Sequence, residues 1–247
     1  MTTGAIDESQ QRAAKAAGLA YLLTFLIVVS VNYGIHDRLI VESNAAETAH
    51  NILAHEQLFR LGIVGDILYC VGVVIQLTAL YVILRPMSQG LALLAALWRL
   101  TWVLMWLVMT LHLFDAVRLV SGADYLRGFE VDRLQSLASL NLSARFDYYY
   151  VGLLFGSLAS TLCAYLWLKS RYIPRWLAIV GVITSTLCVA CTLIFYVFSK
   201  FSDVVNLYWF DTPMGLFDIA TSLWLVFKGL KLPEGMRFRA PAGMVAQ

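Results

Sequence analysis

Seven ionisable side chains stand in or beside long apolar stretches of this 247-residue chain, and their types and spacing could carry chemistry. They are Glu56, Arg60, Asp66, Arg99, His112, Asp115 and Asp218. Ionisable groups are costly within a membrane, so they usually face a partner or a water-filled cavity. A carboxyl group in such a place can hold a proton or a cation, or act as an acid. We therefore predict that these side chains converge on a polar cavity in the outer half of a helical bundle.

The depth of each group along its apolar run predicts which of them meet. With a rise of about 1.5 Å per residue, Asp66 and Asp218 both fall roughly 10 Å below the outer surface. Arg99 lies about 12–15 Å from the cytoplasmic side, and its long side chain can reach outward. We expect Arg60 and Arg99 to pair with an acid inside the membrane, with Asp66 as their shared partner. We expect Asp218 to face the bundle interior, near Asp66 and His112.

The same groups also have a purely structural interpretation. Glu56 and Arg60 are four residues apart, which is the spacing of an ordinary ion pair on a helix surface. Asp115 and Arg118 are three apart and suit a solvated helix end. The two deeper carboxylates would then pair with an arginine inside the bundle and have no other role. The sequence leaves both interpretations open.

A tryptophan stripe runs beside Arg99. Trp98, Trp102 and Trp106 repeat at a spacing of four residues, so they share one face of a helix. They could shelter the guanidinium of Arg99 by cation–π contact. The sequence favours the other interpretation, in which these rings pack against helices or lipid.

Metal binding and nucleophilic catalysis are both disfavoured. Histidine is a zinc ligand by type, but His50 and His55 are five residues apart and point to different faces. The sequence contains neither an HExxH motif nor the GxSxG motif of a serine nucleophile. We expect no metal and no cofactor.

Six apolar runs must position these side chains, and each is near the roughly 20 residues that an α-helix needs to cross a bilayer. The predicted spans are residues 16–35, 59–84, 87–114, 148–168, 176–199 and 208–228. This pattern predicts an all-α fold, a polytopic transmembrane bundle of six helices. We expect a single membrane domain over residues 1–247, with cytoplasmic tails at 1–15 and 231–247.

Composition supports a chain whose main solvent is lipid. It is 60% hydrophobic and 14% charged, whereas soluble domains carry about 25% charged residues. The net charge of +2 is too small to indicate a nucleic-acid partner. The expected partners are the lipid bilayer and a small-molecule, ion or lipid ligand, and the sequence indicates no oligomeric state.

The loops predict orientation and two further helices. Ten Lys or Arg residues fall on one side of the predicted spans and seven on the other, which places both termini in the cytoplasm. Before the second span, Asn44 and Glu47 have the spacing of a capping box. A short amphipathic helix should follow them at the outer surface, and another short helix is expected around Val131–Asn141.

Three segments resemble a known family. They are Asn51–Gly62 with the following Asp66, Leu93–Leu100 around Arg99, and Tyr172–Leu177. Together they resemble the bacterial integral-membrane family called domain of unknown function 4386, over roughly Ala13 to Leu230. The resemblance implies that Glu56, Arg60, Asp66 and Arg99 matter together, and that the protein lies in a bacterial inner membrane. It implies no reaction.

Three functions fit these observations. The first is the binding or transport of a small molecule or ion at an outward-facing polar cavity. The second is a membrane-embedded enzyme that acts on a lipid or isoprenoid-like substrate, with Asp66 or Asp218 as its acid. The third is a non-catalytic partner or sensor subunit. An internal repeat would favour transport and an output domain would favour a sensor, and the sequence indicates neither. We rank binding or transport first.

Overall fold

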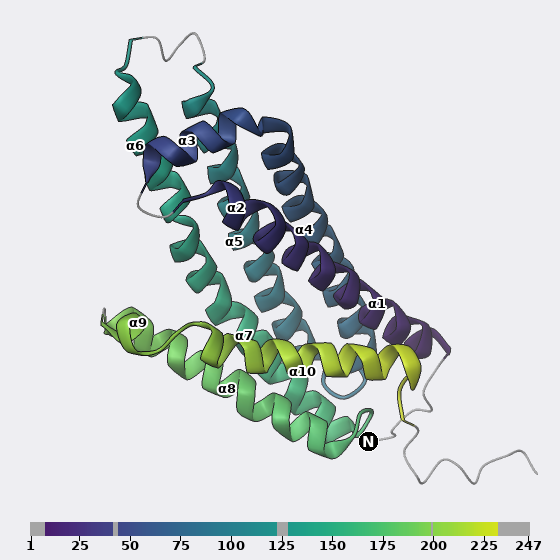
Figure 1. Cartoon of the computed structure of the whole chain (residues 1–247). Helices are drawn as coiled ribbons and strands as arrows, with labels where there is room; N and C mark the ends of the chain where they lie inside the picture. The colour runs from purple at the N-terminus through teal and green to yellow at the C-terminus, as the bar shows by residue number, and fades with distance from the viewer. Residues whose placement is uncertain (1–7, 42–43, 123–127, 199, 232–247) are drawn as a thin grey trace, which may run out of the picture. The chain divides into compact units, whose positions relative to one another are not determined.

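The described part of the chain is helical. The computed structural model describes residues 8–41, 44–122, 128–198 and 200–231, and within these ranges no strand occurs, which confirms the all-α class (Figure 1). In chain order the elements are α1 (Glu8–Val31), the π-helix η1 (Asn32–His36), α2 (Asp37–Leu39), α3 (Ala45–Ala54), α4 (Glu56–Leu84), α5 (Gln89–Val120), α6 (Val131–Ser143), α7 (Arg145–Ser170), α8 (Arg175–Val197), α9 (Phe201–Val204) and α10 (Tyr208–Phe227).

Five helical stretches of the described chain are long and apolar enough to cross a membrane, by length and composition. They are Glu8–Leu39, Glu56–Leu84, Gln89–Val120, Val131–Ser170 and Arg175–Val197. The chain is therefore a multi-pass membrane protein. The sixth predicted span corresponds to α10, which has 20 residues but is not among the five. Its two aspartates and Pro213 make it less apolar, and its crossing of the membrane stays a prediction.

The helices build two compact units. One, here called unit 1, comprises Met1–Leu19, Gln76–Leu97 and Ser157–Gln247. The other, unit 2, comprises Ala20–Ile75 and Trp98–Gly156. Four helices, α1, α4, α5 and α7, contribute residues to both units, so neither unit is a separate stretch of sequence.

In unit 2, the second half of α1 packs closely against α4. A Cβ atom added at Gly65 would meet the side chain of Val31, and one added at Gly72 would meet Thr24. Since the contacts move backwards along α1 as they move forwards along α4, the two helices are antiparallel. At the end of α4 where Phe59 is fully buried, α3 packs against α6 (Figure 1).

In unit 1, α8 packs along α10 (Figure 1). The contact is close because Gly181 lies under the ring of Phe217, which an added Cβ would meet. The start of α1 is held to the end of the described chain by an amide side chain. Gln11 donates its Nε2–H to the Leu230 carbonyl at 3.1 Å and accepts the Leu230 N–H at 3.1 Å.

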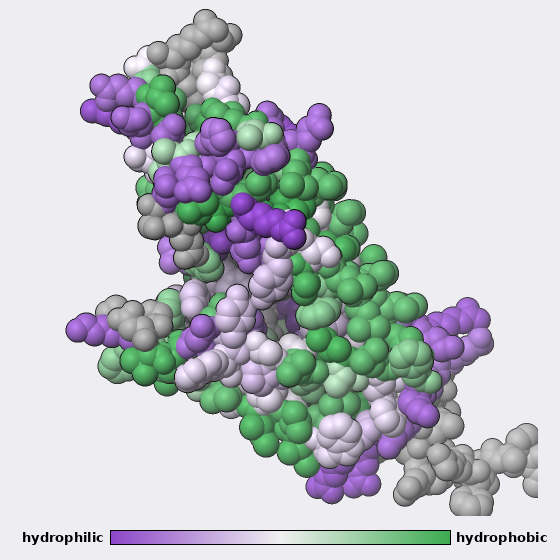
Figure 2. Space-filling model, viewed as in Figure 1, coloured by the Kyte–Doolittle hydropathy of each residue, from purple (hydrophilic) through white to green (hydrophobic). Residues whose placement is uncertain are grey.

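The surface of unit 2 has an apolar region and a polar region. In Figure 2 hydrophobic side chains cover the visible face of α4, and hydrophilic ones gather over α3 and α6. Leu61, Leu68 and Val71 of α4 are each more than half exposed, which suits contact with lipid chains. Glu47 and His50 of α3 are exposed polar groups.

The two loop helices that the sequence indicates are present. Asn44 caps α3 by accepting the backbone N–H of Glu47 at 3.1 Å, and its Nδ2 donates to the Glu47 carboxylate at 2.9 Å. The second helix, α6, begins at Val131 as expected and continues to Ser143. The amphipathic character of α3 and its position on the outer membrane surface stay predictions.

Candidate functional site

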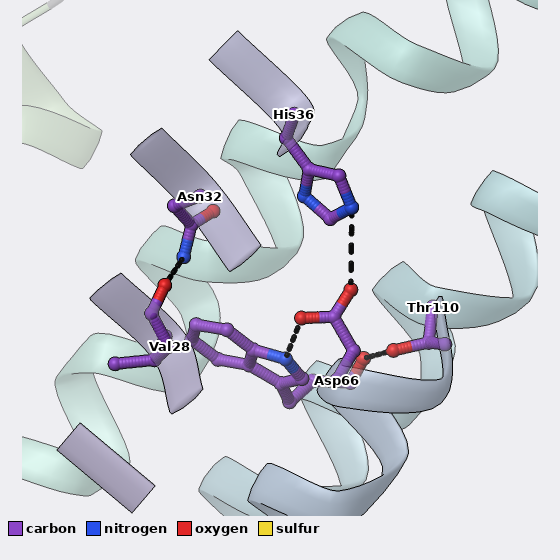
Figure 3. A network of polar contacts seen from close by, with 6 residues as sticks. Val28, Asn32, His36, Asp66 and Thr110 are labelled. Carbon is purple, nitrogen blue, oxygen red and sulfur yellow. Dashed lines mark hydrogen bonds and ion pairs between the residues drawn. The ribbon is translucent and has the colours of Figure 1, made fainter. Parts of the chain in front are cut away.

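A short π-helix interrupts the first helix and carries a buried histidine. After Val31 the backbone widens into η1, which ends at His36, and the His36 side chain is 2% exposed. The Asn32 side chain donates to the Val28 carbonyl at 3.0 Å, so the turn before η1 keeps its polar groups satisfied (Figure 3). Such single π-helical turns occur frequently at functional sites.

Asp66 lies opposite this histidine, on α4. Its side chain is 1% exposed. The indole Nε1–H of Trp106 on α5 donates to its Oδ1 at 3.2 Å (Figure 3). Trp106 is itself 6% exposed, and Thr110 one turn later donates its hydroxyl to the Trp106 carbonyl at 2.9 Å. One carboxylate oxygen is thus held by a buried donor.

The other carboxylate oxygen faces the histidine ring. Asp66 Oδ2 and His36 Nε2 are 3.7 Å apart, which is within ion-pair range but longer than a hydrogen bond (Figure 3). Both atoms are buried, and among the described residues neither has a hydrogen-bond partner. A buried polar atom without a partner is costly, so the pair calls for an explanation beyond packing.

Aromatic rings surround the Trp106 side of the site. The ring of Tyr69 lies 4.5 Å from that of Trp106, centroid to centroid, and the ring of Trp102 lies 5.5 Å from it. Trp102 in turn donates its Nε1–H to the Tyr69 hydroxyl at 3.0 Å. Two of the three rings of the tryptophan stripe, Trp102 and Trp106, therefore pack, as the sequence favours, and Trp106 also supplies a donor to Asp66.

One cation acts on both members of the pair. The charge of Arg145, at the start of α7, influences His36 and Asp66 electrostatically. Its guanidinium lies over the ring of Phe146, 4.8 Å from the centroid. The site thus consists of the carboxyl group of Asp66 and the imidazole of His36, both under the influence of the Arg145 guanidinium.

The two predicted pairs near helix ends are local. Arg60 Nε lies 2.7 Å from Glu56 Oε1, and both side chains are partly exposed. Arg118 Nη1 lies 3.4 Å from Asp115 Oδ1, again at an exposed place. Arg60 therefore takes its carboxylate from the preceding turn of its own helix, where the sequence predicts Asp66 as partner.

Three further predicted residues have other surroundings. His112 stacks on Tyr148 with centroids 4.8 Å apart, and its Nδ1 lies 3.3 Å from Asn141 Oδ1. Arg99 belongs to unit 2 and Asp218 to unit 1, and both are partly buried. The convergence of all seven groups on one cavity stays a prediction.

Sequence reasoning missed His36. The apolar run ends at Ile35, so the histidine reads as the first residue of a loop rather than the last of a buried turn. A signal was present, because His36 immediately follows an uncharged span and Asp66 is the sole charge between Leu61 and Leu84. Among the described residues, no three His, Cys, Asp or Glu side chains lie close enough to hold a metal ion.

The comparisons with known proteins give one match. The model of a family described as "Domain of unknown function (DUF4386)" matches residues 16–229. No curated protein matches the chain, and no solved structure does. The match agrees with the resemblance seen in the sequence, and the family's description states no activity.

Proposed function

Because the chain belongs to the DUF4386 family, whose description assigns no activity, we propose its function from its own residues. It binds a proton, together with a small molecule or ion, at His36 and Asp66 inside the membrane. One observation carries this proposal. Two buried atoms, His36 Nε2 and Asp66 Oδ2, face each other at 3.7 Å without a hydrogen bond.

The distance distinguishes this pair from a structural ion pair. Charges removed from water regain their lost solvation only when they approach closely and their other polar atoms are satisfied. His36 and Asp66 do not meet the first condition, because their facing atoms are 3.7 Å apart without a hydrogen bond, while Asp66 Oδ1 already accepts from Trp106. A pair that exchanges protons or binds a polar ligand needs polar atoms that are not already hydrogen-bonded. In a fully hydrogen-bonded pair, no donor or acceptor is available to a ligand. Intramembrane ionisable residues mark ion and proton pathways for the same reason.

The proposal includes an orientation. Asp66 is ten residues beyond the start of α4 at Glu56, which corresponds to about 15 Å along the helix axis. With both termini in the cytoplasm of a bacterial inner membrane, the pair lies in the outer half of the bilayer. We expect reporter fusions at the C-terminus and in the loop at 115–147 to report opposite sides. The same side for both fusions would contradict this orientation.

Proton binding is tested by infrared spectroscopy of the purified protein in lipid nanodiscs. The carboxyl C=O stretch is recorded as the pH is changed, for the wild type and for Asp66→Asn. We expect a titrating band that Asp66→Asn removes and that His36→Gln shifts. Glu56→Gln is the matched control, since Glu56 lies on the same helix but is partly exposed and paired with Arg60.

Coupling to an ion is tested in proteoliposomes that contain a pH-sensitive dye. We expect the wild type to change the decay of an imposed pH gradient when Na⁺ or K⁺ is added, and Asp66→Asn to behave like empty vesicles. If no carboxyl band is lost in Asp66→Asn, and the variant behaves as the wild type in vesicles, the proposed function is wrong.

A further inference from the structure

We propose that Gly62 is the positioning residue of this site, because it allows the His36 ring to lie against α4 within reach of Asp66. The inference rests on the proposed function for its biological meaning. The contact between position 62 and the His36 ring, which supports it, does not depend on that function. Gly62 lies on α4, and the atom nearest to where its side chain would be is the Nε2 of His36.

The space beside Gly62 is filled by the imidazole. A Cβ atom added there would lie 2.9 Å from His36 Nε2, 3.3 Å from His36 Cδ2 and 3.2 Å from Ile35 Cγ2. Real Cβ atoms essentially never approach a heavy atom closer than 3.0 Å. The atom that must give way is therefore the same nitrogen that faces Asp66 Oδ2.

The spacing on α4 couples this movement to the carboxylate. Gly62 and Asp66 are four residues apart, so they occupy neighbouring positions on one face of the helix. A methyl group at position 62 would push the ring along this face and change the distance from Nε2 to Oδ2. The ring has little room to retreat, because Phe59 packs against it with centroids 5.9 Å apart and is fully buried.

The backbone of η1 holds the histidine from the other side. The N–H of Asp37, directly after His36, bonds to the carbonyls of Asn32 and Ile35, so the end of the π-helix is fixed by two acceptors. The ring is thus placed by η1 behind it and by the glycine in front of it. Both features are needed to bring an imidazole and a carboxyl group from different helices to 3.7 Å.

Two other glycines provide matched controls on the same helix. Gly65 and Gly72 also face α1, but an added Cβ would meet Val31 and Thr24 instead of the histidine. Exchange of either glycine for alanine crowds the Val31 or Thr24 side chain without touching the ring. If Gly62 only served close packing of the two helices, Gly65→Ala would have the same effects as Gly62→Ala.

The first test is nitrogen-15 NMR of histidine-labelled protein in bilayers. The chain has four histidines, and His36→Gln identifies the His36 signal by its loss. We expect Gly62→Ala to shift the His36 Nε2 signal in the same direction as Asp66→Asn, and Gly65→Ala to leave it in place. An unshifted signal in Gly62→Ala, or an equal shift in Gly65→Ala, would overturn the inference.

A thermal double-mutant cycle keeps the inference testable if Gly62→Ala folds poorly. The Tm loss caused by Gly62→Ala is measured in the wild type and in His36→Ala. We expect most of this loss to disappear in His36→Ala, because the ring that the methyl group meets is gone. A loss of the same size in both backgrounds would overturn the inference. Failure of the proposed function leaves the result of this cycle unchanged, since it measures the contact between the methyl group and the ring and not proton or ion binding.

Discussion

The two compact units satisfy their buried polar side chains differently. In unit 1 the buried Gln10 donates to the Ile83 carbonyl at 3.3 Å, and Thr192 donates to the Cys188 carbonyl at 2.8 Å. The described orphans of unit 1 are neutral groups, the hydroxyls of Ser185 and Thr221 and the indole N–H of Trp224. In unit 2 the orphaned atoms belong to His36 and Asp66, which are ionisable.

The two kinds of orphaned group differ in the free energy that their burial costs. A neutral hydroxyl or amide can bond to a nearby carbonyl, and leaving it without a partner costs far less than burying a charge. An ionisable pair costs more, and replacing it with apolar residues is often neutral or stabilising. The orphaned neutral groups of unit 1 therefore need no role beyond packing, whereas the ionisable pair of unit 2 supports the proposed function.

Exchange of the buried carboxyl group should have the largest effect. Asp66→Asn keeps the shape of the side chain but removes its titration, so we expect loss of the titrating carboxyl band and of ion-dependent proton movement. His36→Gln should reduce both. Measurement is by infrared titration and by vesicle flux, with expression and Tm as folding controls.

The exchange of Asp218 for asparagine tests whether unit 1 also contributes an ionisable residue to the site. Asp218 lies in unit 1, and the sequence predicts that it works with Asp66. We expect Asp218→Asn to reduce the pH dependence, but less than Asp66→Asn, since Asp218 is only partly buried. An unchanged pH profile would make Asp218 structural and confine the site to unit 2.

A packing change in unit 1 should affect stability alone. Gly181→Ala places a methyl group against the buried ring of Phe217, and such overpacking costs about 1–3 kcal/mol. We expect a lower free energy of unfolding in detergent, with the Asp66 band unchanged. Gly215→Ala is the control, because a Cβ there meets nothing within 4 Å. A changed Asp66 band would break the separation between the units.

Removing the indole donor of the site should have an intermediate effect. Trp106→Phe keeps an aromatic ring but leaves Asp66 Oδ1 without its donor, at a cost of about 1–2 kcal/mol. We expect lower stability and also a shifted carboxyl band. Trp102→Phe, which loses the bond to Tyr69, should lower stability without moving the band. Equal band shifts in the two variants would contradict a specific role for Trp106.

The exposed pair at the start of α4 should matter least. Glu56→Gln removes the partner of Arg60, and because both side chains are well exposed the loss should be about 0.5 kcal/mol or less. Urea titration of wild type and variant measures it. A loss comparable to that of Trp106→Phe would show that surface charge, rather than burial, sets the stability of this end of unit 2.

The sequence predicts the helices well because long apolar runs leave little choice of structure in a membrane. The cap at Asn44 and the helix beginning at Val131 were also predictable, since both depend on neighbours in the chain. Asp66 was found for a similar reason, as a lone charge in an apolar run stands out in sequence.

The partners of Asp66 could not be predicted in the same way. A π-helical turn has no sequence signature, and without it His36 falls at the end of an apolar run. The indole of Trp106 belongs to a stripe whose spacing indicates a shared face, but spacing does not say where a ring N–H points. Arg60 was assigned to Asp66 by depth, whereas its own helix offers Glu56 one turn away.

Because of the π-helix, the direction of the His36 side chain depends on the number of residues in this turn. A π turn holds more residues than an α turn, so η1 can be regarded as a place where α1 has gained one residue. Deleting Gly34, whose Cβ position contacts nothing within 4 Å, would return this turn to α-helical geometry. Each residue of an α-helix advances the chain by about 100°, so the deletion would rotate His36 away from α4 and leave the preceding helix unchanged. We therefore expect the loss of a single codon here to decide whether the first helix presents an imidazole to the carboxyl group of Asp66.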